Sequence, residues 1–127
     1  MTEEKETMQQ CMIHPTAIID PQAKIGAGVK IGPYAVIGPH VTIGDGTEIM
    51  AHVVIDGWTT IGKNCRFFPS ASIGSEPQDL KFKGEKSYVI IGDRSVFREY
   101  VTVSRATGEG EETRIGSDCL FQACTHV

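Results

Sequence analysis

The sequence predicts an all-β protein, a parallel β-helix in which short strands wind into three-sided coils. The first observation is a repeat, since Ile-Gly occurs at 25–26, 31–32 and 37–38, one pair in each unit of six. The second is its phase, because 12 of the 14 isoleucines share one of the six possible phases. A period of six fits neither a helix nor a long alternating strand. Very short strands separated by regular turns are typical of a β-helix.

The repeat extends over most of the chain. Counted from Ile13, the first position of the unit is a large apolar residue in eleven consecutive units, the last of which begins at Ile73. After two interruptions the same phase returns, at Ile91, Phe97, Val103, Ile115, Phe121 and Val127. We therefore expect a β-helix domain over residues 13–127, and a flexible tail over residues 1–12.

Each position of the unit has an expected place in the coil. The large residue at the first position points inward and stacks on its equivalents in the neighbouring coils. The second position is Gly in eight units, which favours close backbone packing and unusual backbone angles at a turn. The fifth position is small or β-branched and points inward near a corner. Three units form one coil, so residues 13–78 predict between three and four coils.

Two segments interrupt the repeat, EPQDLKFKGEKSYVI at 76–90 and RATGEGEET at 105–113. The first replaces two units and the second replaces one, so we expect loops that leave the coil and return in phase. Binding residues are common on loops carried by a rigid scaffold. Seven of the twelve Lys and Arg lie within 81–114. They either hold a phosphorylated ligand or are ordinary solvated loop charges.

Composition excludes several classes of function. The net charge of −4 argues against a nucleic-acid partner, which would require a basic surface. The first residues, MTEEKETMQQ, lack the apolar region of a secretory signal, and no apolar run is long enough to cross a membrane. The four cysteines show no zinc-ligand spacing and are expected to be free thiols in a reducing compartment, the cytoplasm.

Three stretches carry a resemblance to a known family. They are SIGSEPQDLKFKGE (72–85), IGDRSVFREYVTVSRAT (91–107) and IGSDCLFQACTHV (115–127). With the hexapeptides before them, they resemble UDP-N-acetylglucosamine O-acyltransferase, one of the hexapeptide-repeat acyltransferases, from about Ile13 onward. The resemblance implies a left-handed β-helix. The repeat alone does not give this hand, because right-handed crossovers are the general rule.

The resemblance also implies an activity. These enzymes transfer a 3-hydroxyacyl group from acyl carrier protein to the 3-hydroxyl of UDP-N-acetylglucosamine, the first step of lipid A biosynthesis. They are cytoplasmic homotrimers with active sites between subunits. Acyl carrier protein is the acyl-donor co-substrate, and no metal or other cofactor takes part. Acyl-chain length, and the choice between this sugar and its 3-amino analogue, stay open.

Five residues match positions of the family's site. Gln78, Asp79 and Lys81 match the loop that contacts the nucleotide sugar, although the loop could instead only attach itself to a neighbouring subunit. Ser104 stands where several relatives carry His, and its hydroxyl can donate one hydrogen bond to a phosphate. His126 matches the first histidine of an H-x-x-H pair, an auxiliary group near the sugar, although by itself it could be a surface residue.

The second histidine of that pair, the general base, would stand three residues after His126, beyond Val127. His14, His40 and His52 are expected to be surface groups. The family's chains are about twice as long and continue with further coils and a C-terminal helical domain. We therefore expect the 127 residues to be a truncated part that is inactive alone, with no catalytic residue of its own.

Three other functions are compatible with a hexapeptide coil. The nearest alternative is another acyl- or acetyltransferase acting on a nucleotide sugar. A γ-class carbonic anhydrase would require a zinc site with two closely spaced histidines, which the chain lacks. A flat threonine-rich binding face would require threonines in register, and the threonines are not expected to stack in that way.

Overall fold

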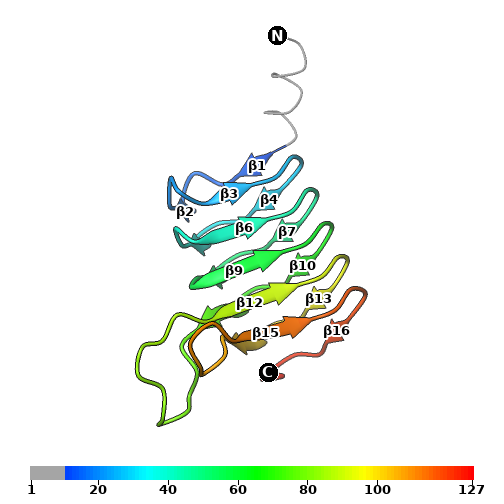
Figure 1. Ribbon diagram of the computed structural model, residues 1–127. Helices are drawn as coiled ribbons and strands as arrows, with labels where there is room; N and C mark the ends of the chain where they lie inside the picture. The colour runs from blue at the N-terminus through cyan, green and yellow to red at the C-terminus, as the bar shows by residue number, and fades with distance from the viewer. Residues whose placement is uncertain (1–10) are drawn as a thin grey trace.

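The structure, a computed structural model, describes residues 11–127. Over these residues sixteen short strands wind into a coil with three parallel sheets as its sides (Figure 1). The predicted all-β fold with three-sided coils is confirmed. The predicted tail falls mostly outside the described residues, while Met12 lies in the first strand.

Each sheet takes every third strand. Sheet A contains β1 (Met12–Ile13), β4 (Lys30–Ile31), β7 (Glu48–Ile49), β10 (Arg66–Phe67), β13 (Val96–Phe97) and β16 (Leu120–Phe121). Sheet B contains β2 (Ile18–Ile19), β5 (Val36–Ile37), β8 (Val54–Ile55), β11 (Ser72–Ser75) and β14 (Thr102–Ser104). Sheet C contains β3 (Lys24–Ile25), β6 (Val41–Ile43), β9 (Trp58–Ile61), β12 (Tyr88–Ile91) and β15 (Glu112–Ile115).

The coil is left-handed, as the resemblance implies. In Figure 1 the strands of sheet C lie nearest the viewer and run from left to right, while the chain descends from its N-terminus. A path that turns in this direction as it descends forms a left-handed screw. The general preference for right-handed crossovers between parallel strands does not hold for this chain.

The register between coils confirms that the interruptions replace whole units. Ile13 pairs with Ile31, which begins the third unit after it, so an uninterrupted coil consists of three units. Ile61 pairs with Ile91 across the first interruption, and Ile91 pairs with Ile115 across the second. These coils are longer than three units by two units and by one unit, respectively. Both loops end earlier than predicted, because β12 begins at Tyr88 and β15 at Glu112.

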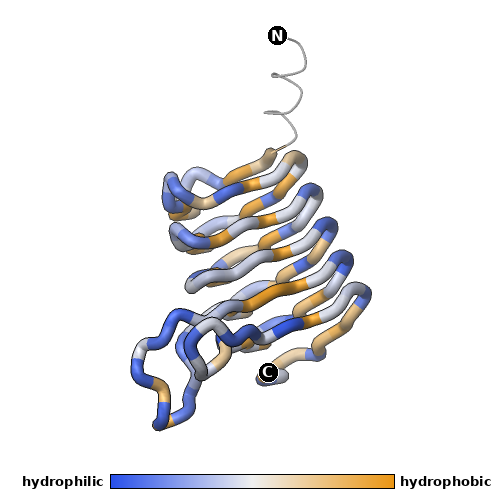
Figure 2. Tube along the Cα trace, viewed as in Figure 1, coloured by the Kyte–Doolittle hydropathy of each residue, from blue (hydrophilic) through white to orange (hydrophobic). Residues whose placement is uncertain are grey.

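The core is a set of stacked columns inside the coil. From Ile31 to Ile115, the isoleucines at the first position are at most 6% exposed. The rings of Phe67, Phe97 and Phe121 continue one column, with centroids 4.7 and 5.0 Å apart. In the first coil Ile13 is 46% exposed. Figure 2 shows the same division, with apolar residues recurring along the strands and polar residues at the corners.

The glycines at the second position allow coils to approach closely, as predicted. A Cβ built on Gly44 would lie 2.5 Å from the carbonyl carbon of Gly62 in the next coil. The prediction of unusual backbone angles at this position is wrong for most units. Positive φ occurs instead at the fourth position, as at Asn64 (56°) and Asp118 (60°), where the chain turns from one sheet to the next. Asn and Asp tolerate this left-handed conformation better than most residues.

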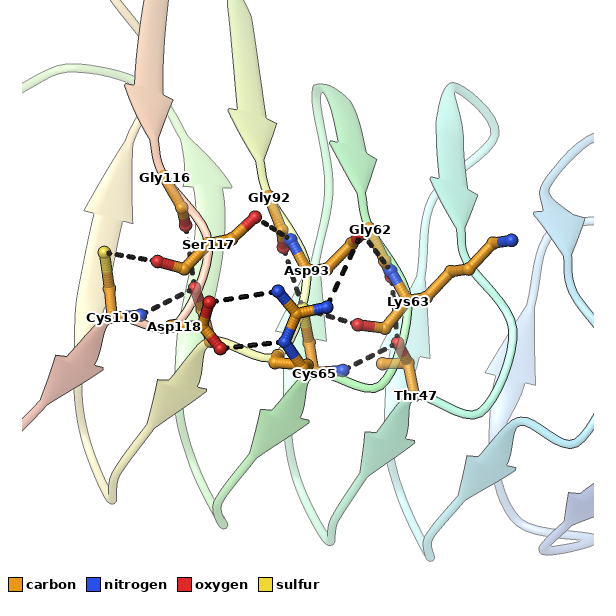
Figure 3. A network of polar contacts seen from close by, with 12 residues as sticks. Thr47, Gly62, Lys63, Cys65, Gly92, Asp93, Gly116, Ser117, Asp118 and Cys119 are labelled. Atoms are coloured by element: carbon orange, nitrogen blue, oxygen red, sulfur yellow. Dashed lines mark hydrogen bonds and ion pairs between the residues drawn. The ribbon is translucent and has the colours of Figure 1, made fainter.

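At the corner between sheets C and A, small polar side chains at the fifth position form hydrogen bonds with backbone carbonyls (Figure 3). Each donates to the carbonyl of a glycine in the following coil and so links two coils. The pairs are Thr47 Oγ1 with Gly62 (3.0 Å), Cys65 Sγ with Gly92 (3.1 Å) and Ser95 Oγ with Gly116 (2.8 Å).

The prediction that no threonines stack in register is wrong at one place on the outer face of sheet C. Thr42 and Thr60 are register partners on β6 and β9, so these two threonines do stack. Both have an outward-facing position because the alternation along each strand points Val41 and Ile43 inward. Lys24 and Ile90 occupy the neighbouring places of the same column, so the threonine run covers only two coils.

The inward orientation of the isoleucines can be tested with a matched pair of variants. Ile43→Asp would place an unpaired charge between coils and should destabilise the fold by more than about 4 kcal/mol. Leu120→Asp makes a similar change at an outward-facing, exposed position of sheet A and should leave the unfolding midpoint nearly unchanged. Thermal unfolding followed by circular dichroism measures both. Equal stability of the two variants would contradict the assignment of faces.

The four cysteines are free thiols, as predicted, and should differ in reactivity. Cys65 is fully buried, and burial raises the pKa of its thiol, so little thiolate forms near neutral pH. Cys124 is exposed. Because labelling follows thiolate content and access, a thiol reagent should modify Cys124 rapidly in the native protein and Cys65 only after unfolding. Mass spectrometry of the labelled peptides gives the order. Early labelling of Cys65 would mean that the corner opens readily.

Candidate functional site

Both loops leave the coil at the same corner. Strand β11 ends at Ser75 and β14 ends at Ser104, and these two residues are register partners in sheet B. The first loop covers residues 76–87 and returns to β12; the second covers residues 105–111 and returns to β15. Because β12 and β15 are neighbours in sheet C, the loops project side by side from the coil (Figure 1). We call them the paired loops.

The paired loops are bonded to each other and to the coil. The amide of Gly110 donates to the carbonyl of Lys86 at 2.8 Å, and the hydroxyl of Ser87 donates to the carbonyl of Ala106. The amide of Arg105 donates to the carbonyl of Ser75 at 2.9 Å. The second loop is therefore bonded to the first at both ends, and the two loops form a single unit.

The predicted sugar-contacting residues lie on the first loop. Gln78, Asp79 and Lys81 are all exposed, and Leu80 between them is fully exposed. Asp79 organises the turn, because its Oδ1 accepts a hydrogen bond from the amide of Lys81 at 2.9 Å. Its carbonyl accepts another from the amide of Phe82 at 3.0 Å. This turn fixes the direction of the Asp79 carboxylate and leaves further acceptor capacity for a ligand.

Ser104 is held in the wall of the coil where the second loop begins. It is 8% exposed, and its carbonyl accepts a hydrogen bond from Thr113 Oγ1 at 2.9 Å. Its amide donates to the carbonyl of Val127 at 3.2 Å. The predicted contact of its hydroxyl with a phosphate stays a prediction.

His126 lies on the outer face of sheet B. It forms a parallel bridge with Thr102, and its Nδ1 lies 2.7 Å from Thr102 Oγ1. The contact orients the ring and leaves Nε2 as the other nitrogen available to a ligand. Since Thr102 is two residues before Ser104, both residues lie in the last strand before the second loop. The other three histidines, His14, His40 and His52, are exposed in upper coils, as predicted.

The predicted site residues carry a carboxylate, an ammonium group, an amide and an imidazole. Such groups suit a ligand with many hydroxyls and a phosphate. The register of sheet B brings Ser75 and Ser104 together, whereas Gln78, Asp79 and Lys81 lie further out on the first loop. Among residues 11–127 no group of three His, Cys, Asp or Glu side chains is placed to hold a metal ion. The same residues include no helix with the length and apolarity that a membrane crossing requires.

Sequence reasoning gave no individual role to two residues at this corner, Thr102 and Arg105, although Arg105 is one of the seven Lys and Arg within 81–114. Thr102 could have been found by counting, because Thr102 and His126 both occupy the sixth position of a unit and are separated by one coil plus the second interruption. Arg105 carries no such signal. Its role depends on contacts with Trp58 and Phe82, which are distant in sequence.

Comparison with known proteins gives close relatives. The family described as the GMPPB C-terminal domain matches residues 7–127. The acyl-[acyl-carrier-protein]–UDP-N-acetylglucosamine O-acyltransferase of Chlamydia abortus is 49% identical over 115 residues, which cover 91% of this chain and 41% of that protein. The enzyme of the same name from Rickettsia canadensis is 49% identical over 121 residues, covering 94% and 46%.

Solved structures agree with these relatives. LpxA from Acinetobacter baumannii superimposes with a TM-score of 0.88 at 47% identity, covering 91% of this chain and 45% of that one. LpxA from Bacteroides fragilis, a UDP-N-acetylglucosamine acyltransferase, gives 0.87 at 47% identity, covering 91% and 46%. The predicted resemblance and fold class are confirmed. The chain spans less than half the length of these relatives.

The contact between Thr102 and His126 should determine the state of the imidazole. Thr102→Val removes the hydroxyl while keeping the strand, at a cost below about 1 kcal/mol in stability. We expect the variant to shift the population of the two His126 ring tautomers, while Thr102→Ser keeps the wild-type state. The nitrogen-15 shifts of the ring nitrogens report this directly. Identical spectra for wild type and Thr102→Val would show that the hydroxyl does not orient the ring.

Proposed function

Because the chain belongs to the family of the GMPPB C-terminal domain and is about half identical to UDP-N-acetylglucosamine O-acyltransferases, we propose that it forms the nucleotide-sugar-binding part of such an enzyme. The reaction is transfer of a 3-hydroxyacyl group from the thioester of acyl carrier protein to the 3-hydroxyl of UDP-N-acetylglucosamine. The sugar oxygen forms the new ester bond, the thioester C–S bond breaks, and the hydroxyl proton passes through a base to the departing thiolate, which becomes the free thiol.

One observation carries the proposal. The loop that matches the family's sugar-contacting loop begins after Ser75, which is paired with Ser104. Ser104 lies in the same strand as Thr102, and Thr102 orients the ring of His126. The first loop thus begins beside the strand end that carries Ser104, at one corner of the coil. Asp79 accepts a hydrogen bond from a sugar hydroxyl or amide, Gln78 adds an amide contact, and Lys81 supplies positive charge near the substrate.

Acyl transfer requires more than binding. The attacking hydroxyl must lose its proton, and donors must stabilise the oxyanion that develops on the thioester carbonyl. His126 serves as an auxiliary group that hydrogen bonds near the reacting sugar. The general base implied by the resemblance stands three residues after His126, beyond the 127 residues. The part of the site on these residues therefore binds and orients the sugar.

The proposal includes an assembly and a setting. The protein acts as a cytoplasmic homotrimer with acyl carrier protein as donor, and it needs neither a metal nor another cofactor. An apolar stripe on the outer face of sheet B, formed by Ile18, Val36 and Val54, supports contact between subunits. Ser72, Thr102 and His126 continue the same outward column. Contact along this face would place the paired loops beside a neighbouring subunit.

A second candidate is transfer to a different nucleotide sugar. Ser104, where relatives carry His, favours this alternative, since a serine offers a phosphate one neutral donor instead of a positive charge. The perosamine N-acetyltransferase of Caulobacter crescentus shares the fold, with a TM-score of 0.73 at 23% identity. Assays that compare UDP-N-acetylglucosamine with its 3-amino analogue separate the two candidates.

A chimera tests the proposal. The 127 residues are joined in register to the remaining residues of the Chlamydia abortus relative, and acyl transfer to UDP-N-acetylglucosamine is measured. The chimera should turn over. Asp79→Asn should lower kcat/KM about 10- to 100-fold, the effect of losing a hydrogen bond to a charged group. Glu76→Gln removes the same charge from the same loop and should change little. Equal rates for the two variants would exclude Asp79 from the site.

The 127 residues alone should not catalyse transfer, because the base implied by the resemblance is not among them. Purified chain, 3-hydroxyacyl-acyl carrier protein and UDP-N-acetylglucosamine are incubated together, and product is measured by mass spectrometry against a protein-free control. Product above the control would place a working base within residues 1–127.

A further inference from the structure

Arg105, at the start of the second loop, packs between two aromatic rings. Its Cζ lies 5.5 Å from the ring centroid of Trp58 in β9 and 5.2 Å from the ring centroid of Phe82 in the first loop. Its stem lies against the corner, where a Cβ on Gly57 would be 3.5 Å from Arg105 Cδ. Arg105 therefore contacts the coil on one side and the first loop on the other.

The Nε of Arg105 is buried and has no hydrogen-bond partner among residues 11–127. Burying such a donor unpaired is unfavourable. The geometry is retained because the flat guanidinium packs on aromatic faces, which attract cations. The planar, weakly hydrated guanidinium suits this packing better than a compact ammonium group does. A lysine at this position would reproduce it only in part.

Trp58 is the meeting point of the coil and both loops. Beyond Arg105, its ring lies 5.3 Å from the Nζ of Lys86, at the end of the first loop, and stacks on His40 of the coil above, with centroids 5.3 Å apart. The first loop is thus attached at Phe82 and again at Lys86. Gln78, Asp79 and Lys81 come directly before the first of these attachments.

We propose that Arg105 is a positioning residue that fastens the first loop to the coil and thereby holds Gln78, Asp79 and Lys81 in place. The fastening itself follows from the contacts with Trp58 and Phe82. The consequence for the nucleotide sugar rests on the proposed function. In this attachment Arg105 contacts the loop through Phe82 and the coil through Trp58.

The fastening is tested on the present chain by limited trypsin digestion. Lys81 and Lys83 flank Phe82, so cleavage there reports detachment of the loop. Arg105→Ala and Phe82→Ala should each raise the cleavage rate roughly ten-fold, since exposed segments open more often when their contacts are lost. The double variant should be no faster than either single variant, because both remove the same contact. Arg105→Lys should keep part of the attachment and give an intermediate cleavage rate.

A matched control is available on sheet A. Arg66→Ala removes a guanidinium that packs 5.0 Å from the ring of Phe68, away from the loops, and should leave cleavage at Lys81 and Lys83 unchanged. Emission of Trp58, the single tryptophan, should change in Arg105→Ala and stay the same in Arg66→Ala. If Arg105→Ala lowers the thermal midpoint of the coil, the cleavage rate of Phe82→Ala tests the attachment instead, because Phe82 lies on the loop. Unchanged cleavage in Phe82→Ala would overturn the proposal.

The consequence for the substrate is tested in the chimera. Arg105→Ala should raise KM for UDP-N-acetylglucosamine with little change in kcat or in KM for the acyl donor, because the loop contributes binding that ground state and transition state share. An unchanged KM in an active chimera, together with faster cleavage, would overturn the positioning role. A wild-type chimera without turnover would count against the proposed function, whereas the cleavage rates would still decide the fastening.

Discussion

Parallel hydrogen bonding between successive coils is the constraint on which the rest of the structure depends. Each strand is very short and pairs in register with the strand three units away, or further where a loop intervenes. A shift of one position would turn Ile43 outward and Thr42 inward. The isoleucine columns, the close approach at Gly44 and the polar corner at Thr47 all require the same register. They are consequences of one pattern and not independent features.

The same constraint explains where the site lies. A coil can add residues only if the chain returns in phase, so the paired loops occupy whole units. Both loops leave from sheet B and return to sheet C, and consecutive coils therefore place them side by side. The two loops begin side by side although Ser75 and Ser104 are far apart in the chain. The coil fixes where the loops begin, and it also carries Ser104 and His126.

The fold could be predicted almost completely from the sequence, because a period of six is visible in any single chain that contains it. The inward isoleucines, the small fifth position and the whole-unit interruptions all follow from counting. Handedness cannot be obtained in this way, since neither the period nor the apolar pattern distinguishes a coil from its mirror image. The pattern also led us to expect positive φ at the glycines of the second position. The turn lies instead at the fourth position, where residues such as Asn64 adopt positive φ.

The site was predictable only in part. Motifs led to the prediction of Gln78, Asp79, Lys81 and His126, whereas the role proposed for Arg105 rests on its contact with Trp58, which belongs to the preceding coil. Contacts of this kind depend on the path of the loops, which no periodicity encodes. The three-unit turn has a further meaning for the evolution of such chains. Duplication or loss of one complete turn in the upper part would alter the height of the molecule while leaving the lower corner intact, so overall size and ligand recognition can diverge independently.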